Sequence, residues 1–403
     1  MLRIKNAGRS LFLTLCVMGL FAILSSTMSK NPVLKPFATS LGAPNDLIGL
    51  VASASTIPGM LVSLPAASLS DVFGRRKILL FSAFVFASAP FLYLFVTSWW
   101  QLIPVRLYHG FATAIFVPVA EATIAELFPA KRGERISIFS SVTAVGRAMA
   151  PFLGGYILFL TNYGYSTLYL AVGAAGVAAF MTALFFLIER KSPETQSVDP
   201  KAATDSMFHG WFKVAKKREI QVVGFVQASQ YYVFGAVEFF LVGYLSEIAG
   251  LDAFSIGVIM GSQVIALILI RPLMGRVSDR IGRRFPIISG SIISSLVLAA
   301  FSFSSYFPAL LLLSIGYGIG FAFVISSTSP LTAEIAPANL VGTSLGFLST
   351  MMDVGQTLGP IISGIILAIT VQYSALFYSL GFLLMVSTLA FTLSKTAKNN
   401  PAP

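Results

Sequence analysis

Long runs of apolar residues dominate this chain, and they limit the folds that it can adopt. Stretches long enough to span about 30 Å of hydrocarbon fall near 10–38, 46–68, 78–98, 101–128, 137–160, 166–188, 220–245, 253–274, 285–304, 307–330, 342–368 and 372–394. Only 11% of the 403 residues are charged, whereas soluble proteins carry roughly a quarter. Because lipid offers no partner to backbone polar groups, each run must be helical. The sequence therefore predicts an all-α membrane protein with twelve transmembrane helices.

The distribution of lysine and arginine predicts the orientation of these helices. Loops on one side carry most of the basic residues, among them Arg75, Arg132 and Arg283, while the opposite loops carry few. The positive-inside rule places the basic loops and both termini in the cytoplasm of a plasma (inner) membrane protein. The net charge of +11 then reflects orientation rather than nucleic-acid binding. Basic residues before the first apolar run resemble a signal peptide, but that run recurs as a repeat element, so we expect it to be retained.

A single long polar segment, 189–219, divides the chain. It separates an expected N-terminal six-helix bundle, 1–188, from an expected C-terminal six-helix bundle, 220–394, and 395–403 forms a cytoplasmic tail. The end of the polar segment interleaves aromatic and basic residues from Met207 to Arg218. This pattern is typical of a helix lying on an anionic membrane surface, and a solvated loop explains it equally well.

The two halves of the chain are copies of each other. A shift of 208 residues places Gly42 on Gly250, Gly49 on Gly257, Asp71 on Asp279, Gly74 on Gly282, Arg75 on Arg283, Arg76 on Arg284 and Glu126 on Glu334. A shift one residue longer places Gly146 on Gly355, Ala150 on Gly359 and Pro151 on Pro360. An ordered series across five helices is not coincidence. The sequence therefore predicts two pseudo-symmetric six-helix bundles, with a substrate bound midway between them.

Three motifs resemble those of one known family. The loop Ala67–Arg76 and its copy Gly275–Arg284 resemble the signature between helices 2 and 3 of the major facilitator superfamily, although Ala67 replaces the usual glycine. Arg106 with Gly110 resembles the helix 4 motif, with His109 where glutamine is common. A third set of residues resembles the helix 5 motif of proton-exchanging exporters, with Ala150 in place of a glycine: Gly146, Ala150, Pro151, Gly154 and Gly155. The resemblance covers essentially the whole chain and implies alternating access.

The doubled loop is predicted to act as a gate on the cytoplasmic side. Asp71 and Asp279 each end a helix beside a glycine that permits a tight turn, so their carboxylates can face the positive end of a helix from the other half. We expect the following arginines to meet Glu126 and Glu334. The candidate gate residues are Asp71, Gly74, Arg75, Arg76, Glu126, Asp279, Gly282, Arg283, Arg284 and Glu334. A plain turn with orienting arginines is the alternative.

Charged residues inside the apolar runs are the candidates for substrate and proton binding: Lys30, Arg106, Glu121, Arg147, Glu238 and Asp353. Each costs about 2.5–3.5 kcal/mol in a membrane and normally pairs or lines a wet cavity. Lys30 and Glu238 are related by the repeat and are expected to meet and close an outer gate. Glu121 and Arg147 are expected to pair, with Glu121 taking a proton when the pair opens. Asp353 is the rival proton carrier.

These features favour a transporter that exports small organic or amphipathic, drug-like compounds by proton antiport, as the resemblance to 12-helix drug–proton antiporters implies. The sequence has no GxxxxGK[ST] nucleotide loop, no CxxC pair and no metal or nucleophile cluster, so we expect neither a cofactor nor an enzyme. An importer or facilitator of a nutrient or organic anion, which Arg147 would suit, is one alternative. A receptor or sensor without transport is another. The expected partners are substrate, protons and the bilayer, without nucleic acid, and the chain is expected to act as a monomer.

Overall fold

A computed structural model describes residues 2–62, 70, 74–187, 214–337 and 340–394 of the chain. Within these ranges every regular element is a helix, and 10 helices are long and apolar enough to cross a membrane. Of the two remaining expected spans, 46–68 extends beyond the described residues, and 220–245 lies in the helix Arg218–Glu247. That helix has 30 residues, and glutamine, tyrosine and glutamate interrupt its apolar sequence. The protein is therefore an all-α, multi-pass membrane protein, and the helices of its described residues are consistent with the twelve spans that its apolar runs predict.

Some sequence-based predictions fall on residues outside these ranges. They concern Asp71, the part of the polar segment from 189 to 213 with its candidate surface helix, and the tail 395–403.

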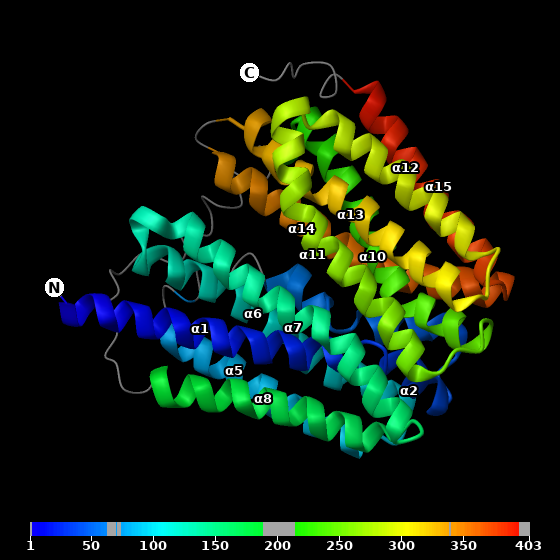
Figure 1. Ribbon diagram of the computed structural model, residues 1–403, viewed down its shortest axis with the longest axis horizontal. Coiled ribbons are helices and arrows are strands. Elements are labelled where there is room, and N and C mark those ends of the chain that lie inside the picture. Colours follow the sequence, from blue (N-terminus) through cyan, green and yellow to red (C-terminus); the bar gives the residue numbers. More distant parts are fainter. Residues whose placement is uncertain (1, 63–69, 71–73, 188–213, 338–339, 395–403) are drawn as a thin grey trace. The chain divides into compact units, whose positions relative to one another are not determined.

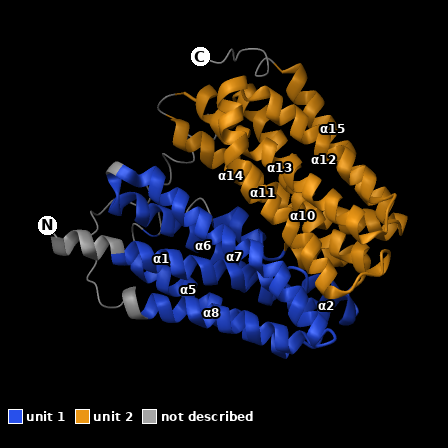
Figure 2. Ribbon diagram, viewed as in Figure 1, with its two compact units in different colours: residues 1–43, 54–204 blue, residues 44–53, 205–403 orange. Residues whose placement is uncertain are grey.

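The chain forms two compact units, coloured separately in Figure 2. Unit 1 comprises residues 1–43 and 54–204, and unit 2 comprises residues 44–53 and 205–403. Figure 1 labels most of the helices. Unit 1 contains α1 (Leu2–Met28), α2 (Leu34–Ser40), α5 (Arg75–Leu92), α6 (Leu102–Leu127), α7 (Arg132–Leu160) and α8 (Tyr165–Leu187), with short 3-10 helices at Tyr93–Phe95, Trp99–Gln101 and Pro129–Lys131. Unit 2 contains α3 (Asn45–Ser53), α10 (Arg218–Glu247), α11 (Ala253–Ile281), α12 (Arg284–Phe301), α13 (Phe307–Ile335), α14 (Val341–Thr370) and α15 (Tyr373–Leu393).

Helix α3 precedes most of unit 1 in the sequence but packs within unit 2, along α14. The Ser53 hydroxyl donates a hydrogen bond to the carbonyl oxygen of Thr357, at 2.6 Å. Gly49 lies so close to the Pro360 backbone that a side chain at this position would overlap it. The chain returns to unit 1 at residues 54–56, which are not helical. Helix 2 of the sequence prediction is therefore divided between the two units.

The internal repeat is visible in the backbone. The glycines with positive φ among the described residues are Gly42 (77°), Gly74 (88°), Gly250 (65°) and Gly282 (87°). They form two pairs separated by the 208 residues of the repeat. Because side chains disfavour positive φ, glycine is the residue that these turns require. The two halves thus share the backbone conformation of their turns, which supports the pseudo-symmetry seen in the sequence.

The first helix differs from its expected extent. The apolar run predicts one span over 10–38, whereas α1 ends at Met28 and α2 begins at Leu34. Pro32 lies in the interruption, and proline removes a backbone donor and disfavours helical conformation in the residue before it. The corresponding part of the second half lies inside α10, which continues to Glu247. The repeat is therefore broken at this point.

Each unit has one end where its basic loops gather, called here the basic end. In unit 1 it comprises residues 74–77 and 128–135, and in unit 2 it comprises residues 276–284, with Arg276, Arg280, Arg283 and Arg284. Above the basic end of unit 1, Phe86, Phe116 and Phe139 are at most 1% exposed. Phe116 contacts both of the others, at ring-centroid distances of 6.0 and 6.1 Å. This aromatic core fixes α5, α6 and α7, which carry the candidates Arg106, Glu121 and Arg147.

Candidate functional site

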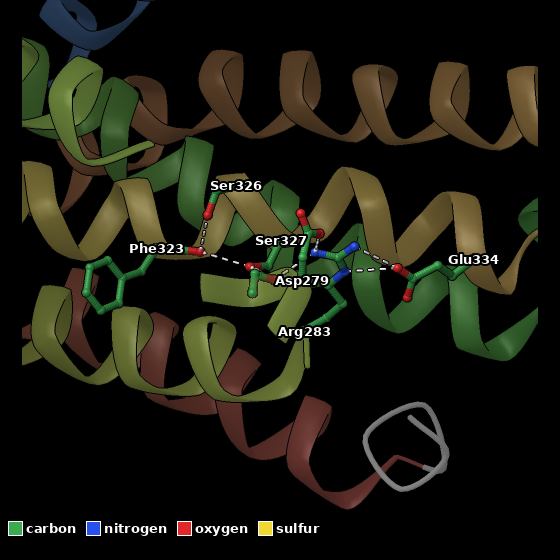
Figure 3. A network of polar contacts seen from close by, with 7 residues as sticks. Asp279, Arg283, Phe323, Ser326, Ser327 and Glu334 are labelled. Carbon is green, nitrogen blue, oxygen red and sulfur yellow. Dashed lines mark hydrogen bonds and ion pairs between the residues drawn. The ribbon is translucent and has the colours of Figure 1, made fainter. Parts of the chain in front are cut away.

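The basic end of unit 2 is organised by Arg283. Helix α11 stops at Gly282, whose φ of 87° turns the chain toward α12. Arg283 then forms ion pairs with Asp279 on the last turn of α11 and with Glu334 near the end of α13 (Figure 3). Its Nε and Nη2 both lie 2.9 Å from Oε1 of Glu334. One guanidinium therefore ties the α11–α12 turn to α13.

Hydrogen bonds extend this contact into the body of unit 2. Arg283 Nη1 donates to the Ser278 hydroxyl at 3.1 Å, and Ser327 Oγ lies 2.9 Å from Ser278 Oγ. Ser327 also donates to the carbonyl oxygen of Phe323, within α13 (Figure 3). The Arg283 side chain is 13% exposed, against 39% for Glu334. Partial burial lowers the pKa of Arg283, but its hydrogen bonds to the two carboxylates outweigh burial and raise the pKa above its usual value, so the cation persists at any physiological pH.

Unit 1 has the corresponding arrangement. Gly74, with φ of 88°, precedes α5, and Arg75 is the first residue of that helix. Arg75 Nη2 lies 2.5 Å from Oε1 of Glu126, close to the end of α6. The two ion pairs expected between loop arginines and glutamates, Arg75–Glu126 and Arg283–Glu334, are therefore both present. Each lies within a single unit, so it fixes the shape of that unit's loop.

The second arginine of each loop, Arg76 or Arg284, lies in the first turn of the helix that follows. Arg76 is half-buried and Arg284 is exposed. Neither position tests the proposed gate, which depends on the two aspartates.

The helix 5 motif is a packing surface in both halves. A Cβ at Gly146 would lie 2.5 Å from the carbonyl oxygen of Leu20 in α1, and Gly154 contacts the segment after α1. Ala150 and Pro151, with Gly155 one turn further, are buried along α7. In unit 2, Gly355 approaches the backbone of Ala228 in α10 in the same way. Leu20 and Ala228 are related by the 208-residue repeat, so α1–α7 and α10–α14 pack in equivalent registers.

The charges within the spans of unit 1 are arranged differently from the prediction. Glu121 on α6 lies beside the hydroxyl of Ser140 on α7. Among the described residues, no ion pair joins it to Arg147. Ser140 precedes Arg147 by seven residues, which corresponds to about 10 Å along a helix. The predicted Glu121–Arg147 pair is therefore absent, because α6 and α7 pack about two turns out of the register that sequence depth suggested.

Arg106 has a different environment from Arg147. It is 1% exposed in α6, and its Nη2 donates to the Ser55 hydroxyl at 2.6 Å. Ser55 lies in the non-helical residues after α3, and Gly110 lets the same backbone approach α6 closely. His109 is buried beside Phe86 at a ring-centroid distance of 6.0 Å. Ser55 could not be recognised from sequence, because it lies 51 residues from Arg106 and belongs to no motif.

The middle of α10 is polar and aromatic. Gln230 donates to Ser291 at 3.0 Å, and Gln227 accepts from Thr328 at 2.7 Å. Phe234 stacks on Phe321 of α13, with ring centroids 4.8 Å apart and planes inclined by 11°. Neither glutamine belongs to a recognised motif, and two amide side chains within an apolar helix were the signal in the sequence that could have identified them.

The three remaining charged candidates lie on separate elements. Glu238 is 7% exposed, one turn beyond Phe234 on α10. Lys30 lies in the interruption between α1 and α2, and Asp353 is half-buried in α14. In the described part of the chain, no three His, Cys, Asp or Glu side chains gather as metal ligands would.

Comparison with known proteins identifies the family to which this chain belongs. A sequence profile of the Major Facilitator Superfamily matches residues 11–242 and again 223–403. The chain belongs to the Major Facilitator Superfamily. It is therefore a membrane transporter of small molecules rather than an enzyme.

Individual superfamily members agree with this assignment. An uncharacterised MFS-type transporter of Methanocaldococcus jannaschii is 24% identical over 86% of this chain and 90% of its own length. The multidrug resistance protein MdtG of Proteus mirabilis is 28% identical over 77% of this chain and 76% of its own length. The crystal structure of the nucleoside transporter NupG superimposes with a TM-score of 0.76, at 16% identity, over 97% of this chain and 99% of NupG. The fold is thus shared with transporters of different substrates.

Proposed function

We propose that this superfamily member exports small organic compounds in exchange for protons, with its basic end and both termini in the cytoplasm. The carrying observation is the helix 5 motif, which forms a close α1–α7 contact at Gly146 and recurs as the α10–α14 contact at Gly355. The resemblance of this motif to that of proton-exchanging exporters favours antiport. The name of the MdtG relative favours drug-like substrates. The positive-inside rule supports the orientation.

Glu121 is the proposed proton carrier. It lies in the α6 span and meets a neutral hydroxyl, Ser140, rather than a cation. Its protonation would therefore leave no arginine without its counter-ion, which makes a neutral form accessible during the cycle. Asp353, half-buried in the α14 span, is the competing carrier.

The aromatic middle of unit 2, where Phe234 and Phe321 are at most 4% exposed, is proposed to receive the apolar part of a substrate when the protein opens. Tyr231 and Phe234 of α10 both contact Phe321 of α13, at ring-centroid distances of 5.2 and 4.8 Å. Aromatic walls with a few placed polar groups are typical of small-molecule sites, and Gln227 and Gln230 supply such groups. Broad substrate acceptance follows from contacts that depend on area more than on fixed geometry.

The available driving force is sufficient for export. One proton supplies about 1.4 kcal/mol per pH unit and about 2.3 kcal/mol per 100 mV. A gradient of one pH unit with 100 mV therefore supplies about 3.7 kcal/mol, enough for a concentration ratio of about 500.

Transport in proteoliposomes tests the proposal. Vesicles with an acidic lumen and the basic end outward should accumulate ethidium or 2-naphthalenesulfonate only while the pH gradient lasts. Glu121→Gln should abolish the proton dependence, and Asp353→Asn should leave it intact. Flux that ignores the gradient would indicate a facilitator instead, and binding without flux would indicate a receptor. If both variants retained proton-driven flux, neither carboxylate would be the carrier.

Asp71 and Asp279 are proposed to close the cytoplasmic gate. Asp279 already shares Arg283 with Glu334, so its carboxylate is held at the end of α11, where it can engage the positive end of another helix. The Arg75–Glu126 contact gives the first loop the same support. In this proposal the arginines shape the loops and the aspartates form the contact that opens and closes.

A further inference from the structure

Arg147 lies in the middle of a membrane span. Helix α7 has 29 residues, and a rise of 1.5 Å per residue places Arg147 about 22 Å from its first residue and about 20 Å from its last. The hydrocarbon layer is about 30 Å thick, so Arg147 lies near its centre. An arginine side chain is too short to carry its charge to either headgroup layer. The guanidinium therefore needs a polar environment inside the protein.

The described residues supply no counter-ion for this charge. Arg147 forms no ion pair or hydrogen bond with any described residue, and its side chain is exposed. Glu121, the acidic candidate of the neighbouring span α6, lies beside Ser140 instead. Arg106, the arginine of the neighbouring span, is by contrast buried and donates to Ser55. Arg106 thus has a hydrogen-bond partner within the protein, whereas the guanidinium of Arg147 is exposed.

The surroundings fix the backbone of α7 around Arg147. Gly146 packs against the α1 backbone at Leu20, and Ala150 on the next turn is fully buried. These contacts fix the turn of α7 that carries Arg147. On the same helix face, Ser140 is also exposed, so a hydroxyl lies two turns from Arg147 toward the basic end. The repeat counterpart of Arg147 is the neutral Gln356, so the second half has no equivalent cation.

We propose that Arg147 binds an anionic group of the transported compound. A guanidinium offers a planar fork of donors that matches a carboxylate, sulfonate or phosphonate in two parallel hydrogen bonds. Compounds that join such a group to an apolar ring would place the ring on aromatic residues and the anion on Arg147. This assignment rests on the proposed transport function and adds organic anions and zwitterions to the compounds that the protein carries.

Two probes of equal ring size and opposite permanent charge test the assignment in proteoliposomes. They are 2-naphthalenesulfonate and (2-naphthylmethyl)trimethylammonium. The wild-type protein should transport the sulfonate. Arg147→Gln should raise the KM for the sulfonate at least tenfold without impairing transport of the ammonium probe, and Arg147→Lys should recover part of the loss. Arg132→Gln, which removes an exposed arginine at the start of the same helix, should change neither.

The outcomes separate the assignment from the proton-antiport proposal. Proton-driven transport of the ammonium probe alone would overturn the role of Arg147 and leave antiport standing. Sulfonate flux that needs Arg147 but ignores the pH gradient would support the role and overturn antiport. Equal loss of both probes in Arg147→Gln, with no rescue by lysine, would mark a structural residue and overturn the assignment. The absence of wild-type flux for either probe would also count against it.

Discussion

Replacing Gly355 with alanine should separate two helices of unit 2 and destabilise it. The glycine lets α14 lie directly on the backbone of α10: a Cβ would lie 3.0 Å from the Tyr232 nitrogen and even closer to the Ala228 carbonyl oxygen. Both obstacles are backbone atoms of a helix, so no rotamer change can relieve the overlap. Small residues support helix association in membranes for this reason. The substitution must move α14 away from α10.

The expected cost is near the upper end for overpacking, about 3 kcal/mol. Alanine also favours the helix over glycine by up to about 1 kcal/mol, so the net loss should be about 2 kcal/mol. Gly342→Ala is the matched control, because Gly342 lies on the same helix with no atom within 4 Å of its Cβ position. It should be neutral or slightly stabilising. The difference between the two variants should therefore be about 2–3 kcal/mol.

Unfolding in mixed micelles with increasing SDS, followed by far-UV circular dichroism, measures this difference. Gly146→Ala should show the same sign, since its Cβ would lie 2.5 Å from the Leu20 carbonyl oxygen at the equivalent α1–α7 contact. If Gly355→Ala unfolded at the same SDS fraction as Gly342→Ala, the backbone contact between α10 and α14 would be refuted. The packing argument for the helix 5 motif would then lose its basis in both halves.

Two further predictions concern charges at the two ends of the units. Arg283→Gln should lower the apparent Tm more than Arg280→Gln, because it leaves two carboxylates together without their cation, whereas the exposed Arg280 forms no ion pair with a described residue. We expect a loss of about 1–2 kcal/mol against at most about 0.5 kcal/mol, and equal shifts in a thermal unfolding assay would contradict this. Exchanging the charges of Lys30 and Glu238 together should restore transport that each single reversal destroys, as an electrostatic outer gate requires; a double variant as inactive as the single ones would exclude that gate.

The apolar runs and the repeat were readable in the sequence because both are local or periodic properties. A run of apolar residues must be a helix in lipid whatever it packs against. A glycine required by a turn's φ angle, such as Gly74 or Gly282, marks that turn in each copy. The ion pairs Arg75–Glu126 and Arg283–Glu334 were also predicted from sequence. The loop motif marked the arginine of each pair, and the 208-residue repeat showed that both the arginine and the glutamate occur in each half.

The predicted Glu121–Arg147 pair failed for a different reason. Depth along a helix was estimated from residue counts, which contain no information about how two helices slide past each other. That register depends on which small residues meet which backbone. It placed Glu121 beside Ser140, about two turns from Arg147. The interruption around Pro32 was a local feature that the apolar pattern concealed.

The sequence by itself determined a twelve-helix membrane transporter with two related halves, since hydrophobic length, charge asymmetry and internal repetition suffice for that conclusion. Tertiary structure decided which charges have partners. Arg106 is bonded to Ser55, whereas Arg147 stays exposed without an ion pair among the described residues. It also placed α3 in unit 2, against α14. Such contacts join residues far apart in the chain, and only the packing of whole helices brings them together.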